Sequence, residues 1–446
     1  MYFKRVITES LAQYSYIIGQ GRDMVVIDPQ PDIDKYLDVS KQEGMTIKAI
    51  LETHRNEDFT VGSRSLSGLT DAKVYIAADN DLRYEYGERI KEDAEVKIGN
   101  MKLKAIHTPG HTLGHMSYVL YVKEDNPYMV FTGDTLFFGG VGRTDFYGED
   151  RLREITAYLY DSIFEKILPL GDHVILCPAH GAGSACGANI EDRPYSTLGY
   201  ERKFNPDLQY KSKEEFIDNA AKMLHKPPYF EDMEKINLKG IGSIGCNINL
   251  KIKYSNQVKE SGSKIVDIRN QRSFLGEHIE DSLYVEPSSI TSFLNWFIST
   301  EEDIIFVTEN QEAEYLNKLY LDMRRVGYRG ELSFLANGLD DWNKESRKVK
   351  ASKYTLADEI KGKINELTIL DIRKESEFKD IDPIKGSITI PMEEIKNRYS
   401  ELPKDKTIYV VCASGIRSTT VASFLEQKNI KTSILLGGIE AYENLD

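Results

Sequence analysis

Long apolar runs, cysteine and excess positive charge are all scarce in this chain of 446 residues. No apolar run reaches the roughly 18 residues of a membrane-spanning helix, so we expect no transmembrane segment. The first residues lack the apolar stretch, followed by small residues, of an export signal, and we therefore expect a cytoplasmic protein. The four cysteines, at positions 177, 186, 246 and 412, are too few and too scattered for a disulfide framework.

The charge balance excludes two classes of partner. The net charge is −14 at pH 7, and an acidic surface repels nucleic acids and anionic membranes. We therefore expect neither as a partner, and solubility alone explains the acidity. The chain is too long for one core and predicts about three domains. The sequence is compatible with a homo-oligomer and does not fix the oligomeric state.

Histidine is rare as well, but its distribution is uneven. Five of the eight histidines lie in or beside short motifs, at positions 54, 107, 111, 115 and 180. Predicted strands place these histidines and Asp134 at or just beyond strand ends, where a rigid scaffold presents site residues. Imidazoles clustered with a carboxylate in this way predict a metal site.

The motifs resemble the metallo-β-lactamase superfamily over residues 1–235, and within it the persulfide dioxygenase branch. They are His54, the segment 107–115, Gly133-Asp134, 142–146, 178–180 and 196–206. The resemblance implies an αββα sandwich over residues 1–240 that binds one Fe(II), or alternatively zinc, through His54, His111 and Asp134. Two histidines and one carboxylate with open positions suit non-haem iron and oxygen chemistry.

A departure from the superfamily is informative about the metal. Its dinuclear zinc hydrolases carry the frame His-x-His-x-Asp-His, which is filled here by His54, Asn56, Asp58 and Phe59. An amide and a phenyl ring replace two imidazoles, so we expect the second metal position to be lost. Asp58 and His180 are then expected to orient ligands or substrate. Ordinary buried hydrogen bonding is the alternative for both.

The rest of the chain contains an internal repeat. Segment 265–274 resembles 369–378, and Thr308 and Cys412 each lie 41 residues after an aspartate of these segments. Strands alternate with helices, which predicts two small α/β domains with parallel sheets. Both resemble rhodanese domains, over residues 241–350 and 355–446. A predicted helix at 213–225, followed by Pro227-Pro228, marks the linker before them.

The two copies differ where the chemistry of a rhodanese takes place. In the second, Cys412 begins a short loop ending in Arg417, and inward-pointing N–H groups with this cation hold a thiolate or an anion. A buried structural thiol is one alternative. A phosphatase is another, although its arginine lies one residue further on. Thr308 takes the cysteine position in the first copy, which we expect to be inactive.

Three further side chains receive expectations. Cys186 is either a thiol that holds a persulfide near the metal or a small buried residue. Cys177 and Cys246 are expected to be structural. Arg143 is expected to bind a carboxylate of a thiol carrier.

The resemblance extends to fusion proteins of this domain order, and it implies a multidomain α+β and α/β protein that clears persulfides. Fe(II) and O2 would oxidise the persulfide of glutathione, coenzyme A or bacillithiol to sulfite, and Cys412 would convert sulfite to thiosulfate. Two alternatives stay open. One is a thioester hydrolase like glyoxalase II, and the other is a sulfur carrier whose metal site has decayed.

Overall fold

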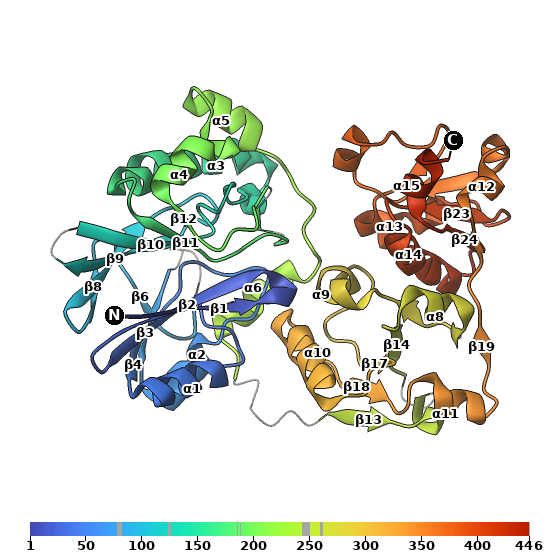
Figure 1. The fold of residues 1–446 in the computed structure, drawn as a ribbon, viewed down its shortest axis with the longest axis horizontal. Coiled ribbons are helices and arrows are strands. Elements are labelled where there is room, and N and C mark those ends of the chain that lie inside the picture. Colours follow the sequence, from blue (N-terminus) through green and yellow to red (C-terminus); the bar gives the residue numbers. More distant parts are fainter. Residues whose placement is uncertain are drawn as a thin grey trace. The chain divides into compact units, whose positions relative to one another are not determined.

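The computed structural model describes residues 1–77, 83–123, 126–184, 186–187, 189–242, 250–258 and 262–445. The chain forms two compact units (Figure 1), Met1–Ile248 with Arg324–Gly327, and Asn249–Met323 with Tyr328–Asp446. The expectation for Cys246 lies outside the described residues. Across the described ranges, no helix has the length and apolarity needed to cross a membrane.

The first unit is built on two mixed sheets, each of six strands. The first sheet contains, in spatial order, β1 (Tyr2–Thr8), β2 (Gln13–Gln20), β3 (Asp23–Ile27), β4 (Thr46–Leu51), β5 (Lys73–Ile76) and β6 (Glu88–Arg89). The second runs β12 (Ser196–Thr197), β11 (Ile175–Pro178), β10 (Asn126–Gly133), β9 (Met116–Lys123), β8 (Met101–His107) and β7 (Glu95–Ile98).

Helices cover the outer faces of both sheets (Figure 1). They are α1 (Asp34–Glu43) and α2 (Ser63–Thr70) on the first sheet, and α3 (Leu152–Asp161), α4 (Leu198–Phe204) and α5 (Lys213–Ala220) on the second. In β3, Val25 belongs to the core between the sheets, and Val26 to the core under α1 and α2. Strands buried on both faces require this continuous apolar sequence, and the predicted αββα layering is confirmed.

The end of the first unit differs from the expectation. The helix predicted at 213–225 ends at Ala220, and after Pro227-Pro228 the chain forms a further helix, α6 (Phe230–Lys239). Leu224 explains the early end, because its N–H donates to Asp145 Oδ2 over 2.9 Å. The backbone of this segment thus bonds to a loop instead of continuing the helix.

The second unit contains two α/β repeats with parallel sheets of the same topology. The first orders its strands β13 (Lys251–Lys253), β18 (Leu332–Leu335), β17 (Ile304–Val307), β14 (Lys264–Asp267) and β16 (Leu283–Tyr284). The second orders them β20 (Tyr354–Thr355), β24 (Thr432–Leu435), β23 (Ile408–Val411), β21 (Thr368–Asp371) and β22 (Ile388–Thr389). The strands β15 (His278–Ile279) and β19 (Val349–Lys350) form a separate pair.

The helices of the repeats follow the predicted alternation. They are α7 (Ser255–Val258), α8 (Gln271–Gly276), α9 (Ile290–Phe293), α10 (Ala313–Arg325) and α11 (Leu339–Lys344), then α12 (Ala357–Ile360), α13 (Ile395–Arg398), α14 (Ile416–Gln427) and α15 (Gly438–Glu443).

Each repeat buries an aspartate at the end of a strand against an arginine two residues later. The Asp267–Arg269 and Asp371–Arg373 pairs have N–O distances of 2.7 and 2.8 Å.

Candidate functional site

Three buried side chains from the ends of three strands meet in the first unit. His54 follows β4, His111 lies between β8 and β9, and Asp134 follows β10. Oδ2 of Asp134 lies 3.6 Å from Nε2 of His54 and 3.5 Å from Nε2 of His111. The structure therefore brings together the three residues that the sequence singled out as ligands.

The other nitrogen of each imidazole is held by a hydrogen bond. Nδ1 of His111 lies 3.0 Å from the carbonyl of Arg143, and since a carbonyl only accepts, Nδ1 carries the proton. Nδ1 of His54 lies 2.8 Å from the hydroxyl of Thr53, which itself donates to Asp28 Oδ2 over 2.8 Å. Both imidazoles thus keep their Nε2 lone pairs for the group that they face.

The atoms that face one another have no partner within the described part of the chain. Nε2 of His54, Nε2 of His111 and Oδ2 of Asp134 are buried and make no hydrogen bond there. Unsatisfied buried polar atoms are rare in folded proteins, and one cation bound by all three would account for them. Two neutral imidazoles and a carboxylate suit Fe(II), and they also suit zinc.

The charges in the site are set by burial and by neighbouring groups. Burial lowers the pKa of His54 to about 4, which keeps this imidazole neutral at pH 7. Burial alone would raise the pKa of Asp134, but the imidazoles of His180 and His54 hold it well below its usual range. Burial would lower the pKa of His111, but Glu57 and Asp134 raise it, so a metal competes with a proton there.

His180 connects this group to a second buried cluster. Its Nδ1 lies 2.7 Å from Asp134 Oδ1, and its Nε2 lies 2.9 Å from Asp58 Oδ2. Ligand atoms of Asp58, His180 and Cys186 all lie within 4.8 Å of one another. Phe59 faces His180 edge-on, with ring centroids 6.3 Å apart. This geometry suits positioning roles for Asp58 and His180, which stay predictions.

Cys186 belongs to this cluster and is fully buried. Burial raises the pKa of its thiol well above the usual value, and Asp58 and Asp134 add to the rise. A thiol that resists ionisation is a weak nucleophile. A sulfur-holding role for Cys186 therefore stays a prediction that its surroundings oppose. Cys177, at the centre of β11, is buried in the core as a structural thiol would be.

Arg143 is also buried, and its charge is already paired. Its Nε and Nη2 each donate to Asp145 over 2.7 Å, and Nη2 donates to the carbonyl of Leu224 over 3.0 Å. In this arrangement the guanidinium joins two loops. The predicted binding of a carrier carboxylate stays a prediction, and it requires Asp145 to release Arg143.

The sequence reasoning missed a residue that holds the loop after His54. Asn237 on α6 donates from Nδ2 to the carbonyls of Asn56 and Phe59 over 2.7 and 2.9 Å, and its Oδ1 accepts from the N–H of Val61. Asn237 is buried among the apolar positions of its helix. A polar residue on an apolar helix face is the only signal that the sequence contains.

The second repeat presents Cys412 directly after β23. The thiol is buried, and its Sγ accepts a hydrogen bond from the N–H of Gly415 over 3.1 Å. Gly438 packs against this loop with φ +61°, and a Cβ there would meet the Cys412 carbonyl oxygen at 2.3 Å. The glycine is therefore required for the close approach of the two backbones.

Arg417 lies in the first turn of α14, close to the Cys412 loop. Its Nη1 and Nη2 donate to the two carboxylate oxygens of Glu377 over 2.9 and 2.6 Å. This hydrogen bonding raises the pKa of Arg417, so its charge is permanent. The Arg417–Glu377 pair places a fixed cation near the loop. Because Arg417 already bonds to Glu377, an anion that binds in the loop shares the guanidinium with this carboxylate.

The equivalent loop of the first repeat is occupied by its own side chains. Oγ1 of Thr308 accepts from the N–H of Asn310 over 3.1 Å. The next residue, Glu309, accepts hydrogen bonds from Ser273 and Asn270 over 2.5 and 3.2 Å. Thr308 and Glu309 line a cavity of about 510 Å³. This cavity therefore has a threonine at the position of Cys412 and a carboxylate, Glu309, at the next position.

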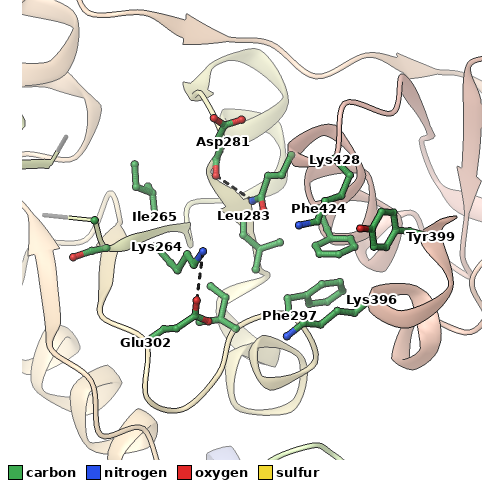
Figure 2. Close-up of a pocket in the computed structure, with 14 residues that line it drawn as sticks. Lys264, Ile265, Asp281, Leu283, Phe297, Glu302, Lys396, Tyr399, Phe424 and Lys428 are labelled. Atoms are coloured by element: carbon green, nitrogen blue, oxygen red, sulfur yellow. Dashed lines mark hydrogen bonds and ion pairs between the residues drawn. The ribbon is translucent and has the colours of Figure 1, made fainter. Parts of the chain in front are cut away.

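A larger cavity, of about 630 Å³, lies between the two repeats (Figure 2). Apolar and charged side chains of both signs line it, among them Leu283, Phe297, Phe424, Lys264, Lys428 and Glu302. Phe424 and Lys428 lie at or beyond the last turns of α14, whereas Cys412 precedes its first turn. A helix of 12 residues is about 18 Å long, so this cavity is not the sulfur-transfer pocket.

The first domain is an αββα sandwich with a buried His-His-Asp group. Two α/β repeats follow it, and one of them carries a loop cysteine. These features define the class of protein: a metal-binding domain fused to sulfurtransferase-type domains. Residues 9–180 match the Metallo-beta-lactamase superfamily, and residues 252–345 and 356–445 each match the Rhodanese-like domain. The chain belongs to the metallo-beta-lactamase superfamily and carries two rhodanese-like domains after that domain.

Individual relatives agree with this assignment. A hydroxyacylglutathione hydrolase of Haemophilus influenzae is 27% identical, over 44% of this chain and 93% of the relative. The mitochondrial persulfide dioxygenase of Bos taurus is 29% identical, over 51% of this chain and 83% of the relative. A solved metallo-beta-lactamase structure from Staphylococcus aureus is 28% identical, with a TM-score of 0.67 over 75% of this chain and 98% of that chain.

Proposed function

We propose that this protein is a non-haem Fe(II) persulfide dioxygenase joined to a Cys412 sulfurtransferase. The observation that carries the proposal is the group of His54, His111 and Asp134, beside which Asn56 and Phe59 replace the imidazoles of a second metal position. Bound iron would supply a site for O2 and the terminal persulfide sulfur together. His54, His111 and Asp134 would hold the metal on one face and leave open positions.

The overall reactions balance without a further oxidant. The persulfide RSSH, with O2 and water, gives the thiol RSH, sulfite and two protons, so sulfur is oxidised and O2 is reduced. A second RSSH transfers its outer sulfur to the Cys412 thiolate, and its S–S bond breaks to release RSH and leave a Cys412 persulfide. Sulfite then attacks the outer sulfur of that persulfide, the S–S bond breaks, and thiosulfate forms while the Cys412 thiolate is regenerated. In this second step Gly415 and Arg417 would stabilise the charge on sulfur. The carrier is a thiol such as glutathione, coenzyme A or bacillithiol, in a reducing cytoplasm.

Metal analysis combined with oxygen uptake tests the proposal. Protein purified without oxygen should hold about one iron per chain, and it should consume O2 when a glutathione or coenzyme A persulfide is added. Protein that holds no metal and shows no persulfide-dependent O2 uptake would favour instead the sulfur carrier with a decayed metal site.

A metal-dependent thioester hydrolase is the second candidate. Two observations favour it: His180 persists in contact with both Asp134 and Asp58, and one relative is a hydroxyacylglutathione hydrolase. Such chemistry uses a water held between two metals. About two zinc ions per chain, with hydrolysis of S-lactoylglutathione, would establish the hydrolase and refute the dioxygenase.

Thr308→Ala tests the proposal that the first rhodanese-like domain is catalytically inactive. We expect unchanged rates of O2 uptake and thiosulfate formation, because Thr308 carries no thiol and its hydroxyl accepts from the backbone N–H of Asn310. The lost hydrogen bond should cost about 0.5–1.5 kcal/mol of stability, which thermal unfolding measures. A well-folded variant that forms markedly less thiosulfate would contradict the prediction.

A further inference from the structure

Glu57 is a buried carboxylate at the edge of the metal-binding group. Its side chain is 2% exposed, and its Oε2 lies 3.5 Å from His111 Nε2, the same distance that separates His111 from Asp134. Oε2 of Glu57 has no hydrogen-bond partner within the described residues. Glu57 lies outside the tight group of His54, His111 and Asp134 and approaches it from the His111 side.

The direction of this oxygen is set by Arg55. The other carboxylate oxygen, Oε1, accepts a hydrogen bond from Arg55 Nη2 over 3.1 Å. The same nitrogen lies 3.5 Å from Glu234 of α6. Because Arg55 holds Oε1, Oε2 is the oxygen that faces His111.

The contact between Glu57 and His111 requires a proton or a metal ion between the two side chains. Nδ1–H of His111 donates a hydrogen bond to the Arg143 carbonyl, so the neutral imidazole has only a lone pair on Nε2. A lone pair facing a carboxylate oxygen at 3.5 Å repels it, unless a proton or a metal lies between them. Asp134 Oδ2 also faces Nε2 of His111, and this contact likewise requires a proton or a metal ion between the two atoms. One divalent cation would satisfy both carboxylates.

Charge balance favours the same arrangement. Two neutral imidazoles and Asp134 leave a bound divalent ion with one uncompensated positive charge in a fully buried site. A second carboxylate would neutralise it. Asn56 immediately precedes Glu57 and occupies the position of an imidazole in the superfamily frame. This chain therefore lacks one metal donor of the frame and has the carboxylate of Glu57 at the next position.

We propose that Glu57 is a fourth protein donor to the metal, which makes the centre a two-histidine, two-carboxylate site. This inference rests on the metal site of the proposed function, but it does not depend on the reaction. The chemistry of the donors fits Fe(II), and the same set would bind Co(II), whose visible absorption reports its ligands.

Titration of the metal-free full-length chain with Co(II) tests the assignment. Glu57→Gln keeps the size of the side chain and removes its charge. We expect Co(II) affinity to fall by more than the roughly 10–100-fold of a lost outer-sphere partner, with a change in the visible absorption bands. The Co(II) affinity of Glu57→Asp should lie between those of Glu57→Gln and the wild type. Glu234→Gln removes the other carboxylate beside Arg55 and should bind as wild type does.

The outcomes are separable from the fate of the proposed function, since no readout uses O2 or persulfide. An unchanged spectrum for Glu57→Gln would overturn the inference, whether or not affinity falls, because a donor cannot be lost without altering it. Should Glu57→Gln fail to fold, Glu57→Asp decides in the same way. A protein that shows the Glu57 effect but no O2 uptake would refute the dioxygenase and leave the ligand assignment standing.

Discussion

Replacing His111 by alanine is expected to remove the metal and abolish O2 uptake, while the C-terminal sulfurtransferase continues. His111 is fully buried and supplies one of the three donor atoms of the group. Loss of an outer-sphere partner alone weakens metal binding about 10–100-fold, so the loss of a ligand should exceed this range. Iron content after anaerobic purification and O2 consumption with a persulfide measure the effect.

The control for this variant is His173→Ala, which removes an exposed histidine whose Nε2 lies 3.1 Å from the Pro127 carbonyl oxygen. It should keep full iron and full O2 uptake. Thiosulfate sulfurtransferase activity of His111→Ala verifies that its second unit is folded. Full iron occupancy in His111→Ala would refute the ligand assignment.

Cys412→Ser is expected to change the product from thiosulfate to sulfite. The hydroxyl keeps the size of the loop side chain and accepts from the Gly415 N–H, but its high pKa prevents it from carrying sulfur. O2 uptake should stay at the wild-type rate, because no residue of the second unit is a proposed ligand. Trapping and quantifying sulfite and thiosulfate in the same reaction measures the shift.

Arg417→Ala provides the graded comparison. Backbone N–H groups of the loop still hold an anion, so thiosulfate formation should weaken less than in Cys412→Ser. Thiosulfate produced by Cys412→Ser at the wild-type rate would contradict the pathway. Cys186 would then be the next thiol to replace.

The clustering of His54, His111 and Asp134 and the layered fold could be predicted because they depend on local patterns. His54 lies just beyond β4, Asp134 follows β10 directly, and the ends of these apolar strands bring the side chains together. The equivalence of Thr308 and Cys412 was likewise visible from spacing alone, since both repeats count 41 residues from their aspartates.

What the sequence did not reveal depends on contacts between distant segments. The segment after Ala220 has helical periodicity, but the Leu224 backbone bonds to Asp145 and Arg143. Asn237 donates a hydrogen bond to the carbonyl of Asn56, although the two residues are 181 positions apart in the sequence. Glu57 looked like one acidic residue among many, because only the contact with Arg55 fixes which way it points.

The buried Asp–Arg pair that both repeats keep has a consequence for how the duplicated half of the chain evolved. Breaking such a pair costs about 3–5 kcal/mol, so Asp267–Arg269 and Asp371–Arg373 would each be retained by selection for folding alone. Cys412 and Thr308 are free of that constraint, and one copy could lose its reactive residue while its architecture survived. The first repeat therefore keeps a stable fold in which the loop at Thr308 could be replaced by one with a different reactive residue.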